Sequence, residues 1–253
     1  MKRLGMRVRA SWKFARVLMH VATGFCTVVF IFPALCTSKK EERIQAWALA
    51  LLARFAIQLA VVGEPPARGP VLLAANHISW LDIVVMHAAR HCRFVSKADL
   101  KRWPLIGTLA ASAGTLFIER ESRRSAMRVV HHMAERLRAG DVLAVFPEGT
   151  TSDGVNLLPF HANLFQAAIA ADAPVLPVAL QFEDIATGAR SLAPCYINND
   201  SLLGSIWRTL AAPPLRAVLI FGEPQPALGR DRRAWAADLR SAVEDLRGKS
   251  AAV

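Results

Sequence analysis

The sequence predicts an α/β fold, in which a mostly parallel sheet is flanked by helices and preceded by an N-terminal pair of apolar helices. Three observations lead to this prediction. From residue 70 onward, short apolar runs alternate with amphipathic stretches, which is typical of covered parallel strands joined by helices. A long apolar stretch follows a cationic N-terminal segment, and a linker rich in proline and glycine, residues 63–70, comes before the alternating part.

The N-terminal part has the pattern of a membrane-associating segment. Residues 1–16 carry six cations and no acid, and the apolar stretch 17–35 follows, long enough to cross a hydrocarbon core or to lie in one leaflet. A second apolar stretch, 46–62, comes after the polar link 38–45. Residues 1–62 are therefore expected to form a membrane hairpin that leaves the rest of the chain on the cytoplasmic side. A cleaved signal peptide and a pair of buried core helices are the alternatives.

The main domain is expected to cover residues 63–253. Its apolar runs predict strands at VLLAA (71–75), CRFV (92–95), TLFI (115–118), VLAVF (142–146), VLPVAL (175–180) and AVLIF (217–221). Helical patterns fit residues 80–90, 122–139, 162–171 and 231–247. Ligands of such sheets bind beyond the carboxyl ends of the strands, so the site is expected in the loops that follow these runs.

The composition restricts the partners. A formal net charge of +11 calls for an anionic partner, either a membrane surface or a nucleic acid. No basic–aromatic pattern or nucleic-acid motif accompanies the charge, so an anionic membrane is expected and no nucleic acid. The four scattered cysteines are typical of reduced thiols in a cytoplasmic protein. The histidines of HAARH (87–91) have no third ligand at a suitable spacing, so no metal site is expected.

The first polar cluster, NHISWLD (76–82), directly follows a predicted strand. His77 and Asp82 would lie about 140° apart on a continuous helix. They meet only if His77 lies in the turn before the helix and Asp82 in its first turn, where the helix dipole also favours a carboxylate. Such a pair supplies a general base and the carboxylate that orients it.

Further polar residues follow other predicted strands. Lys97 stands in FVSKADL and Arg120 ends GTLFIER, so both cations are expected at the edge of the sheet that carries His77. FPEGTTSDG follows the run at 142–146, and its proline and glycine predict a tight turn whose backbone amides suit an anion. Glu148 is an unusual residue to bury there without a polar ligand.

NHISWLD, GTLFIER, FPEGT and LPVAL occur in this order, and the set resembles the four motifs of the glycerolipid acyltransferases. This PlsC-like family includes the 1-acylglycerol-3-phosphate and lysophospholipid acyltransferases. The resemblance covers about residues 70–225 and implies the glycerol-3-phosphate acyltransferase-like fold for the catalytic domain. It implies transfer of a fatty acyl group from acyl-CoA or acyl-carrier protein to the hydroxyl of a lysolipid, with 1-acyl-sn-glycerol-3-phosphate as the first candidate. It implies no cofactor and a place on the bacterial inner membrane.

The resemblance also implies a role for each matching residue. His77 would act as the general base and Asp82 would hold it. The residues implied to bind the acceptor are Asn76, Lys97, Arg120, Glu148, Gly149, Thr150 and Thr151. Family members that use lysophosphatidate usually carry arginine where Thr151 stands, because arginine suits phosphate. A lyso-ornithine lipid, which has no phosphomonoester, is therefore the alternative acceptor, and an inactive lipid-binding scaffold is the non-enzyme alternative.

Overall fold

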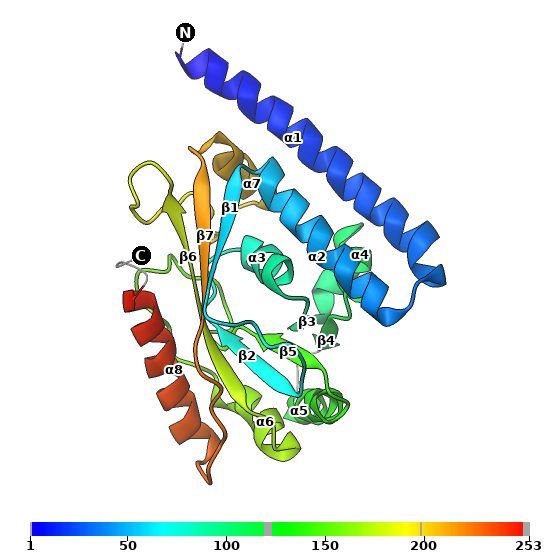
Figure 1. The fold of residues 1–253 in the computed structure, drawn as a ribbon, viewed down its shortest axis with the longest axis vertical. Helices are drawn as coiled ribbons and strands as arrows, with labels where there is room; N and C mark the ends of the chain where they lie inside the picture. The colour runs from blue at the N-terminus through cyan, green and yellow to red at the C-terminus, as the bar shows by residue number, and fades with distance from the viewer. Residues whose placement is uncertain (1, 119–122, 198, 250–253) are drawn as a thin grey trace.

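The computed structural model describes residues 2–118, 123–197 and 199–249 (Figure 1). A seven-stranded sheet lies at its centre, in the order β1-β7-β6-β2-β5-β3-β4. Neighbouring strands are parallel except for the pair β6 and β7. The mostly parallel, helix-flanked sheet that the sequence predicts is confirmed.

The strands are β1 (Ile57–Val62), β2 (Val71–Ala75), β3 (Arg93–Lys97), β4 (Leu116–Ile118), β5 (Val142–Val145), β6 (Val175–Asp184) and β7 (Leu215–Phe221). Each of the six predicted runs contains a strand. The prediction that 46–62 is one helix is wrong, because IQLAVV at 57–62 pairs along its whole length with β7. A short apolar run fits a helix and a strand equally well. Here the run becomes a strand because β7 would otherwise have no hydrogen-bonding partner on the side away from β6.

The helices are α1 (Lys2–Cys26), α2 (Thr37–Arg54), α3 (Leu81–Ala89), α4 (Ile106–Ser112), α5 (Arg123–Arg138), α6 (Gln166–Ala171), α7 (Leu202–Ala211) and α8 (Arg232–Lys249). Shorter helical turns are η1 (Thr27–Ile31), η2 (Phe32–Ala34), η3 (Ala98–Arg102) and η4 (Ala162–Phe165). The four helices predicted in the main domain are found with shifts of a few residues, whereas α4 and α7 were not predicted.

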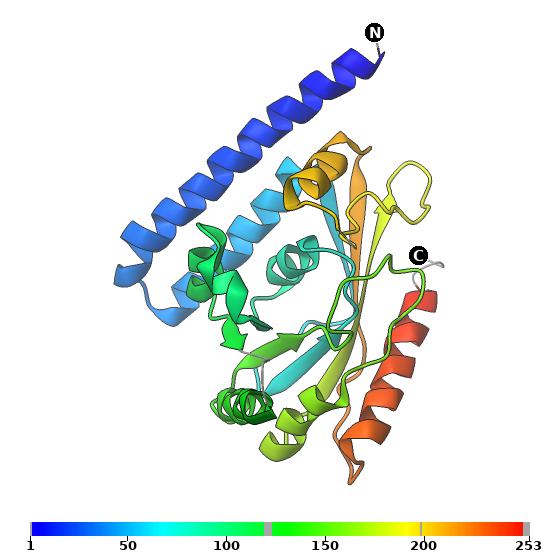
Figure 2. The same cartoon turned by 180° about the vertical axis from the view of Figure 1, so that it is seen from behind.

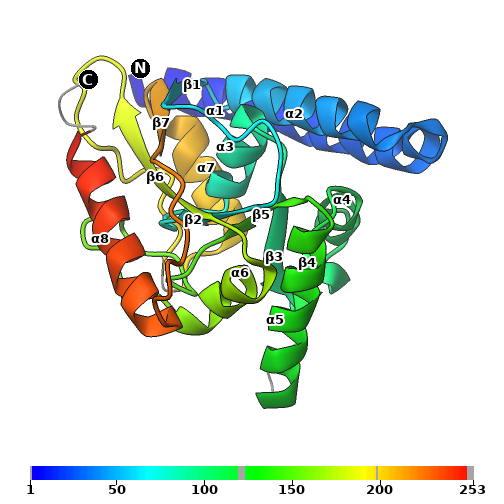
Figure 3. The same cartoon turned by 60° about the horizontal axis from the view of Figure 1, so that its bottom comes forward.

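Helices cover both faces of the sheet. On β2, Val71, Leu73 and Ala75 pack into the core beneath α2, α3 and α7, whereas Leu72 and Ala74 pack against α5, α6 and α8. Figures 2 and 3 show α8 on the opposite side of the sheet from α1, α2 and α3. Because both faces of the central strands are buried, their sequences are almost continuously apolar.

α1 and α2 form an antiparallel pair, joined through η1 and η2 (Figure 1). The rings of His20 and Trp47 stack with centroids 5.1 Å apart, and Trp47 Nε1 donates to the His20 carbonyl at 3.2 Å. A Cβ on Gly24 would lie 2.4 Å from Trp47 Nε1, so a glycine is needed where the two helices meet. On its other side α2 buries Leu51 and Leu52 in the core.

The two N-terminal helices therefore differ in their surroundings. α2 belongs to the packed core, and it begins at Thr37, so the segment 38–45 that was predicted as a polar link is part of the helix. Among the described residues, one helical segment, Ala10–Ala34, has the length and the apolar composition needed to cross a membrane. The membrane role of the pair stays a prediction.

Candidate active site

The loops that follow β2 and β5 form one site. The two strands are neighbours and run parallel, so both loops leave the same edge of the sheet. The backbone N–H of His77 donates to Oε1 of Glu148 at 2.7 Å, and the N–H of Ser152 donates to the His77 carbonyl at 2.9 Å. Sheet order thus brings NHISWLD and FPEGT into direct contact although they are distant in the sequence.

His77 and Asp82 have the arrangement that their spacing required. α3 begins at Leu81, so His77 lies in the preceding turn and Asp82 in the first turn of the helix. Oδ2 of Asp82 is 2.8 Å from His77 Nδ1 and also accepts the backbone N–H groups of Ile78 at 2.6 Å and Ser79 at 2.8 Å. Three contacts and complete burial fix this carboxylate in place.

These contacts also determine which ring nitrogen of His77 is basic. An oxygen that accepts two backbone N–H groups is a hydrogen-bond acceptor toward the ring as well, so Nδ1 carries the proton. No residue that the structure describes forms a hydrogen bond with Nε2. The His77 side chain is 17% exposed, at the carboxyl edge of the sheet. In the neutral ring, the pair therefore holds the lone pair of Nε2 in a fixed orientation at the carboxyl edge of the sheet.

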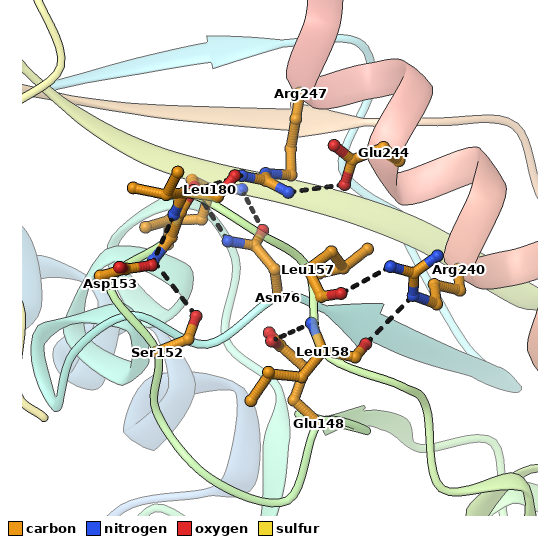
Figure 4. Close-up of polar contacts among 12 residues, drawn as sticks. Asn76, Glu148, Ser152, Asp153, Leu157, Leu158, Leu180, Arg240, Glu244 and Arg247 are labelled. Atoms are coloured by element: carbon orange, nitrogen blue, oxygen red, sulfur yellow. Dashed lines mark hydrogen bonds and ion pairs between the residues drawn. The ribbon is translucent and has the colours of Figure 1, made fainter. Parts of the chain in front are cut away.

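Glu148 connects three segments of the site, and Figure 4 shows its contact with Leu158. Its Oε1 accepts from His77 and its Oε2 accepts from the backbone N–H of Leu158 at 3.0 Å. Burial raises the pKa of this carboxyl, while the N–H donors of Leu158 and His77 oppose that shift. The sequence suggested no polar partner for a buried Glu148, and the structure shows that backbone N–H groups form hydrogen bonds with both of its carboxylate oxygens.

Two other residues expected to bind the acceptor also have protein partners here. The amide of Asn76 donates to the carbonyl of Leu180 at 2.9 Å and accepts from its N–H at 2.7 Å, which joins the end of β2 to β6 (Figure 4). The hydroxyl of Thr151 donates to the carbonyl of Tyr196. These contacts hold the loops in position, and binding of the acceptor by these side chains stays a prediction.

The remaining predicted residues lie along the same edge or outside the described part. Lys97 is exposed at the carboxyl end of β3, and Thr150 is exposed in the turn after β5. Gly149 has φ +73°, and a Cβ there would lie 2.7 Å from the ring of His161. The turn therefore requires glycine. Arg120 lies outside the described residues.

Two arginines of α8 contribute to the site without any signal in the local sequence. Nη2 of Arg247 donates to the carbonyls of Gly154 and Val155, the latter at 3.1 Å, although this guanidinium is almost fully buried. Arg240 donates to two carbonyls further along the same loop, at 2.6 and 3.2 Å (Figure 4). A charged C-terminal helix is usually a solvated surface, so only the packing of α8 shows this role.

Comparison with known proteins identifies the family. Residues 57–181 match the family model described as Acyltransferase. The chain is 36% identical over 243 residues to the lyso-ornithine lipid O-acyltransferase of Pseudomonas aeruginosa, which covers 94% of this chain and 93% of that protein. The chain belongs to the acyltransferase family. The resemblance seen in its motifs is thereby confirmed, and the protein is an acyltransferase enzyme.

A further relative of this acyltransferase and a solved structure extend the comparison. The 1-acyl-sn-glycerol-3-phosphate acyltransferase of Neisseria gonorrhoeae is 41% identical over 188 residues, 74% of this chain and 72% of that protein. The crystal structure of the 1-acyl-sn-glycerophosphate (LPA) acyltransferase, PlsC, from Thermotoga maritima superimposes with a TM-score of 0.71 over 98% of both chains. At 20% identity, that structural similarity is one of fold.

Proposed function

We propose that this acyltransferase moves a fatty acyl group from acyl-CoA or acyl-carrier protein to the hydroxyl of a lysolipid, with His77 as the general base. The observation that supports this most is the hydrogen bond from His77 Nδ1 to the buried Asp82, which leaves Nε2 free. A histidine held in one tautomer by a carboxylate is suited to take a proton from a hydroxyl and to return it later.

In the proposed reaction the acceptor hydroxyl gives its proton to Nε2 while its oxygen bonds to the thioester carbonyl carbon. Collapse of the tetrahedral intermediate breaks the carbon–sulfur bond, and the proton on Nε2 passes to the leaving sulfur. Asp82 stabilises the imidazolium in between, since its carboxylate faces Nδ1 at 2.8 Å. Neither a covalent enzyme intermediate nor a cofactor is needed for this sequence of steps.

The first candidate acceptor is 1-acyl-sn-glycerol-3-phosphate, which would yield phosphatidic acid. It is the acceptor named for the Neisseria gonorrhoeae relative. Lys97 is exposed at the carboxyl end of β3, and in this proposal it supplies a positive charge for the phosphate. The backbone amides of the turn at Gly149 would add neutral donors, as turns of this kind do for anions.

A lyso-ornithine lipid is the second candidate, favoured by a specific feature of the FPEGT loop. Thr151 stands where arginine would suit a phosphate, and its hydroxyl is already bonded to Tyr196. The Pseudomonas aeruginosa relative, which matches 94% of this chain, carries the name of that activity. An acceptor without a phosphomonoester would need no cation at this position.

We further propose that the enzyme works at the bacterial inner membrane, with the catalytic domain on the cytoplasmic side. Support comes from the N-terminal helical segment formed by α1 and η1. Its exposed side chains include Trp12 and Met19 of α1 and Phe30 of η1, at 66%, 69% and 78% exposure. Cations dominate the first sixteen residues and suit anionic headgroups. The hydrophobic side chains are then covered by lipid, and a lysolipid reaches the site from the same membrane.

The deciding experiment measures thiol release from acyl-CoA by the purified protein in detergent, with lysophosphatidate and lyso-ornithine lipid assayed side by side. His77→Ala is expected to reduce kcat by about 10²- to 10⁴-fold, the usual contribution of a general base, while lysolipid binding survives. The matched control is His131→Ala, which removes an exposed histidine of α5 and should leave the rate unchanged.

Each outcome has a definite meaning. Turnover on lysophosphatidate supports the first acceptor, and turnover on the ornithine acceptor alone supports the second. Activity of His77→Ala within about tenfold of the unchanged enzyme would exclude the general-base role. Lysolipid binding without any thioester turnover would instead indicate a membrane scaffold.

A further inference from the structure

Four aromatic rings lie in contact from α3 to the loop that carries His77. His77 and Phe146 stack with their centroids 3.9 Å apart and their planes 8° from parallel. Phe94 stacks on Phe146 at 5.6 Å and 17°, and His87 of α3 packs on Phe94 at 5.1 Å and 76°. The stack therefore supports one face of the His77 ring with residues from three other segments of the fold.

The hydrogen bond to Asp82 does not by itself fix the plane of the His77 ring. The terminal torsion of histidine is broad, because it joins a tetrahedral carbon to a planar ring. One bond at Nδ1 restrains that atom and still allows the ring to tilt about it. Phe146 limits this tilt from the face of the ring, and Phe94 lies behind Phe146.

We propose that Phe146 is a positioning residue for His77, and that its ring also stabilises the imidazolium formed during acyl transfer. A cation within about 6 Å of an aromatic centroid is attracted by the ring face, an effect of roughly 0.5–2 kcal/mol. The protonated His77 would lie well within that distance, at 3.9 Å. The inference rests on the proposed general-base role of His77.

The alternative is that Phe146 only fills space. It is partly buried and packs against the core, so an aliphatic side chain of similar size would then serve equally well. Among the residues that the structure describes, the charged groups bonded to His77 are Asp82 of α3, at the ring, and Glu148 of the loop after β5, at the backbone N–H. Both remain when Phe146 is replaced, so a change in pH dependence would report on the lost ring.

The test compares Phe146→Leu with Phe146→Tyr in the full-length enzyme. Phe146→Leu is expected to lower kcat about two- to thirtyfold, the rate equivalent of the lost ring interaction, with KM unchanged for both substrates. The acid limb of its kcat/KM profile is expected at lower pH, because the imidazolium is less stable without the aromatic face. Phe146→Tyr keeps the ring and should retain kcat. Phe160→Leu, which removes a ring stacked on Phe165 instead, is the matched control.

A Phe146→Leu enzyme with kcat within twofold of the unchanged protein and an unmoved pH profile would overturn the proposal. If the leucine variant fails to fold, Phe146→Met and Phe146→Tyr decide, since equal kcat values for these two would also overturn it. His77→Ala is assayed in parallel. If His77→Ala is active, the proposed general-base function is wrong. If His77→Ala is inactive and Phe146→Leu is fully active, only the inference about Phe146 is wrong.

Discussion

Thr151 illustrates how one side chain can change the acceptor side of the site. Its hydroxyl donates to the carbonyl of Tyr196, so it ties the FPEGT loop to the segment before α7 instead of presenting a charge. Asn76 and Glu148 likewise bond to backbone groups of the protein. At the residue scale, several side chains that the motifs predict to bind the acceptor thus form hydrogen bonds that hold the loops of the site in position.

Thr151→Arg is expected to shift preference toward a phosphate acceptor. A guanidinium at this position adds a charge-assisted hydrogen bond to phosphate, worth about 1.5–3 kcal/mol. We expect the ratio of kcat/KM for lysophosphatidate over lyso-ornithine lipid to rise at least about tenfold, since 1.4 kcal/mol is a tenfold change. Thr151→Val removes the bond to Tyr196 without adding charge and is the control. If the ratio of kcat/KM values is unchanged in Thr151→Arg, the side chain at this position does not determine the preference for a phosphate acceptor.

At the scale of single elements, α3 contributes residues both to the candidate active site and to the buried core. Its first turn carries Asp82, while His87 in its last turn is buried and stacks on His91 with ring centroids 5.2 Å apart. Nδ1 of each of these two rings has no hydrogen-bond partner among the described residues. Burial lowers the pKa of His87 to about 3, with a smaller contribution from His91. Burial likewise lowers the pKa of His91, to about 4, so both rings are neutral near pH 7. The described residues contain no cluster of three or more histidine, cysteine, aspartate or glutamate side chains.

This burial predicts a loss of stability in acid. A histidine whose pKa is lowered in the folded state binds its proton mainly when unfolded, so stability present above the ordinary pKa of 6.5 is lost as pH falls toward about 3. Between pH 7 and pH 5 the free energy of unfolding should fall by about 2 kcal/mol through His87 alone.

His87→Phe should remove this contribution, and denaturant unfolding at the two pH values measures it. The exposed His131→Phe should leave the pH dependence unchanged and serves as the control. An identical fall in the free energy of unfolding for His87→Phe and for the unchanged protein would contradict the assignment of His87 as a buried neutral residue.

At the scale of the whole molecule, the N-terminal helices and the sheet are not separable pieces. β1 pairs with β7 at the edge of the sheet, and α2 contributes Leu51 and Leu52 to the core. A deletion of everything before Gly63 would therefore remove core packing together with α1. The exposed side chains of α1 are the better target, because changing them leaves the core contacts in place.

The combined substitution Trp12→Gln, Met19→Gln and Phe30→Gln is expected to release the enzyme from membranes. Burying large apolar side chains contributes about 1.5–3 kcal/mol each, so losing three should lower the membrane partition coefficient by about a thousandfold or more. Sedimentation with vesicles of phosphatidylethanolamine and phosphatidylglycerol measures it. The control replaces exposed Met127, Leu192 and Leu228 by glutamine in the same way. Complete sedimentation of the variant with Trp12, Met19 and Phe30 replaced would contradict a membrane role for α1 and η1.

The sequence by itself determined the alternation of strands and helices, the order of the four motifs and the requirement for His77 to meet Asp82 in a turn. These features depend on local periodicity and short spacing, which neighbouring residues specify directly. Only the tertiary structure decided that 57–62 is a strand, because a short apolar run adopts the conformation that its partner completes. It also decided that α8, through Arg247, holds the loop beside His77, and that Phe146 lies against the ring. Such contacts join residues far apart in the chain, and their geometry exists only once the sheet order is set.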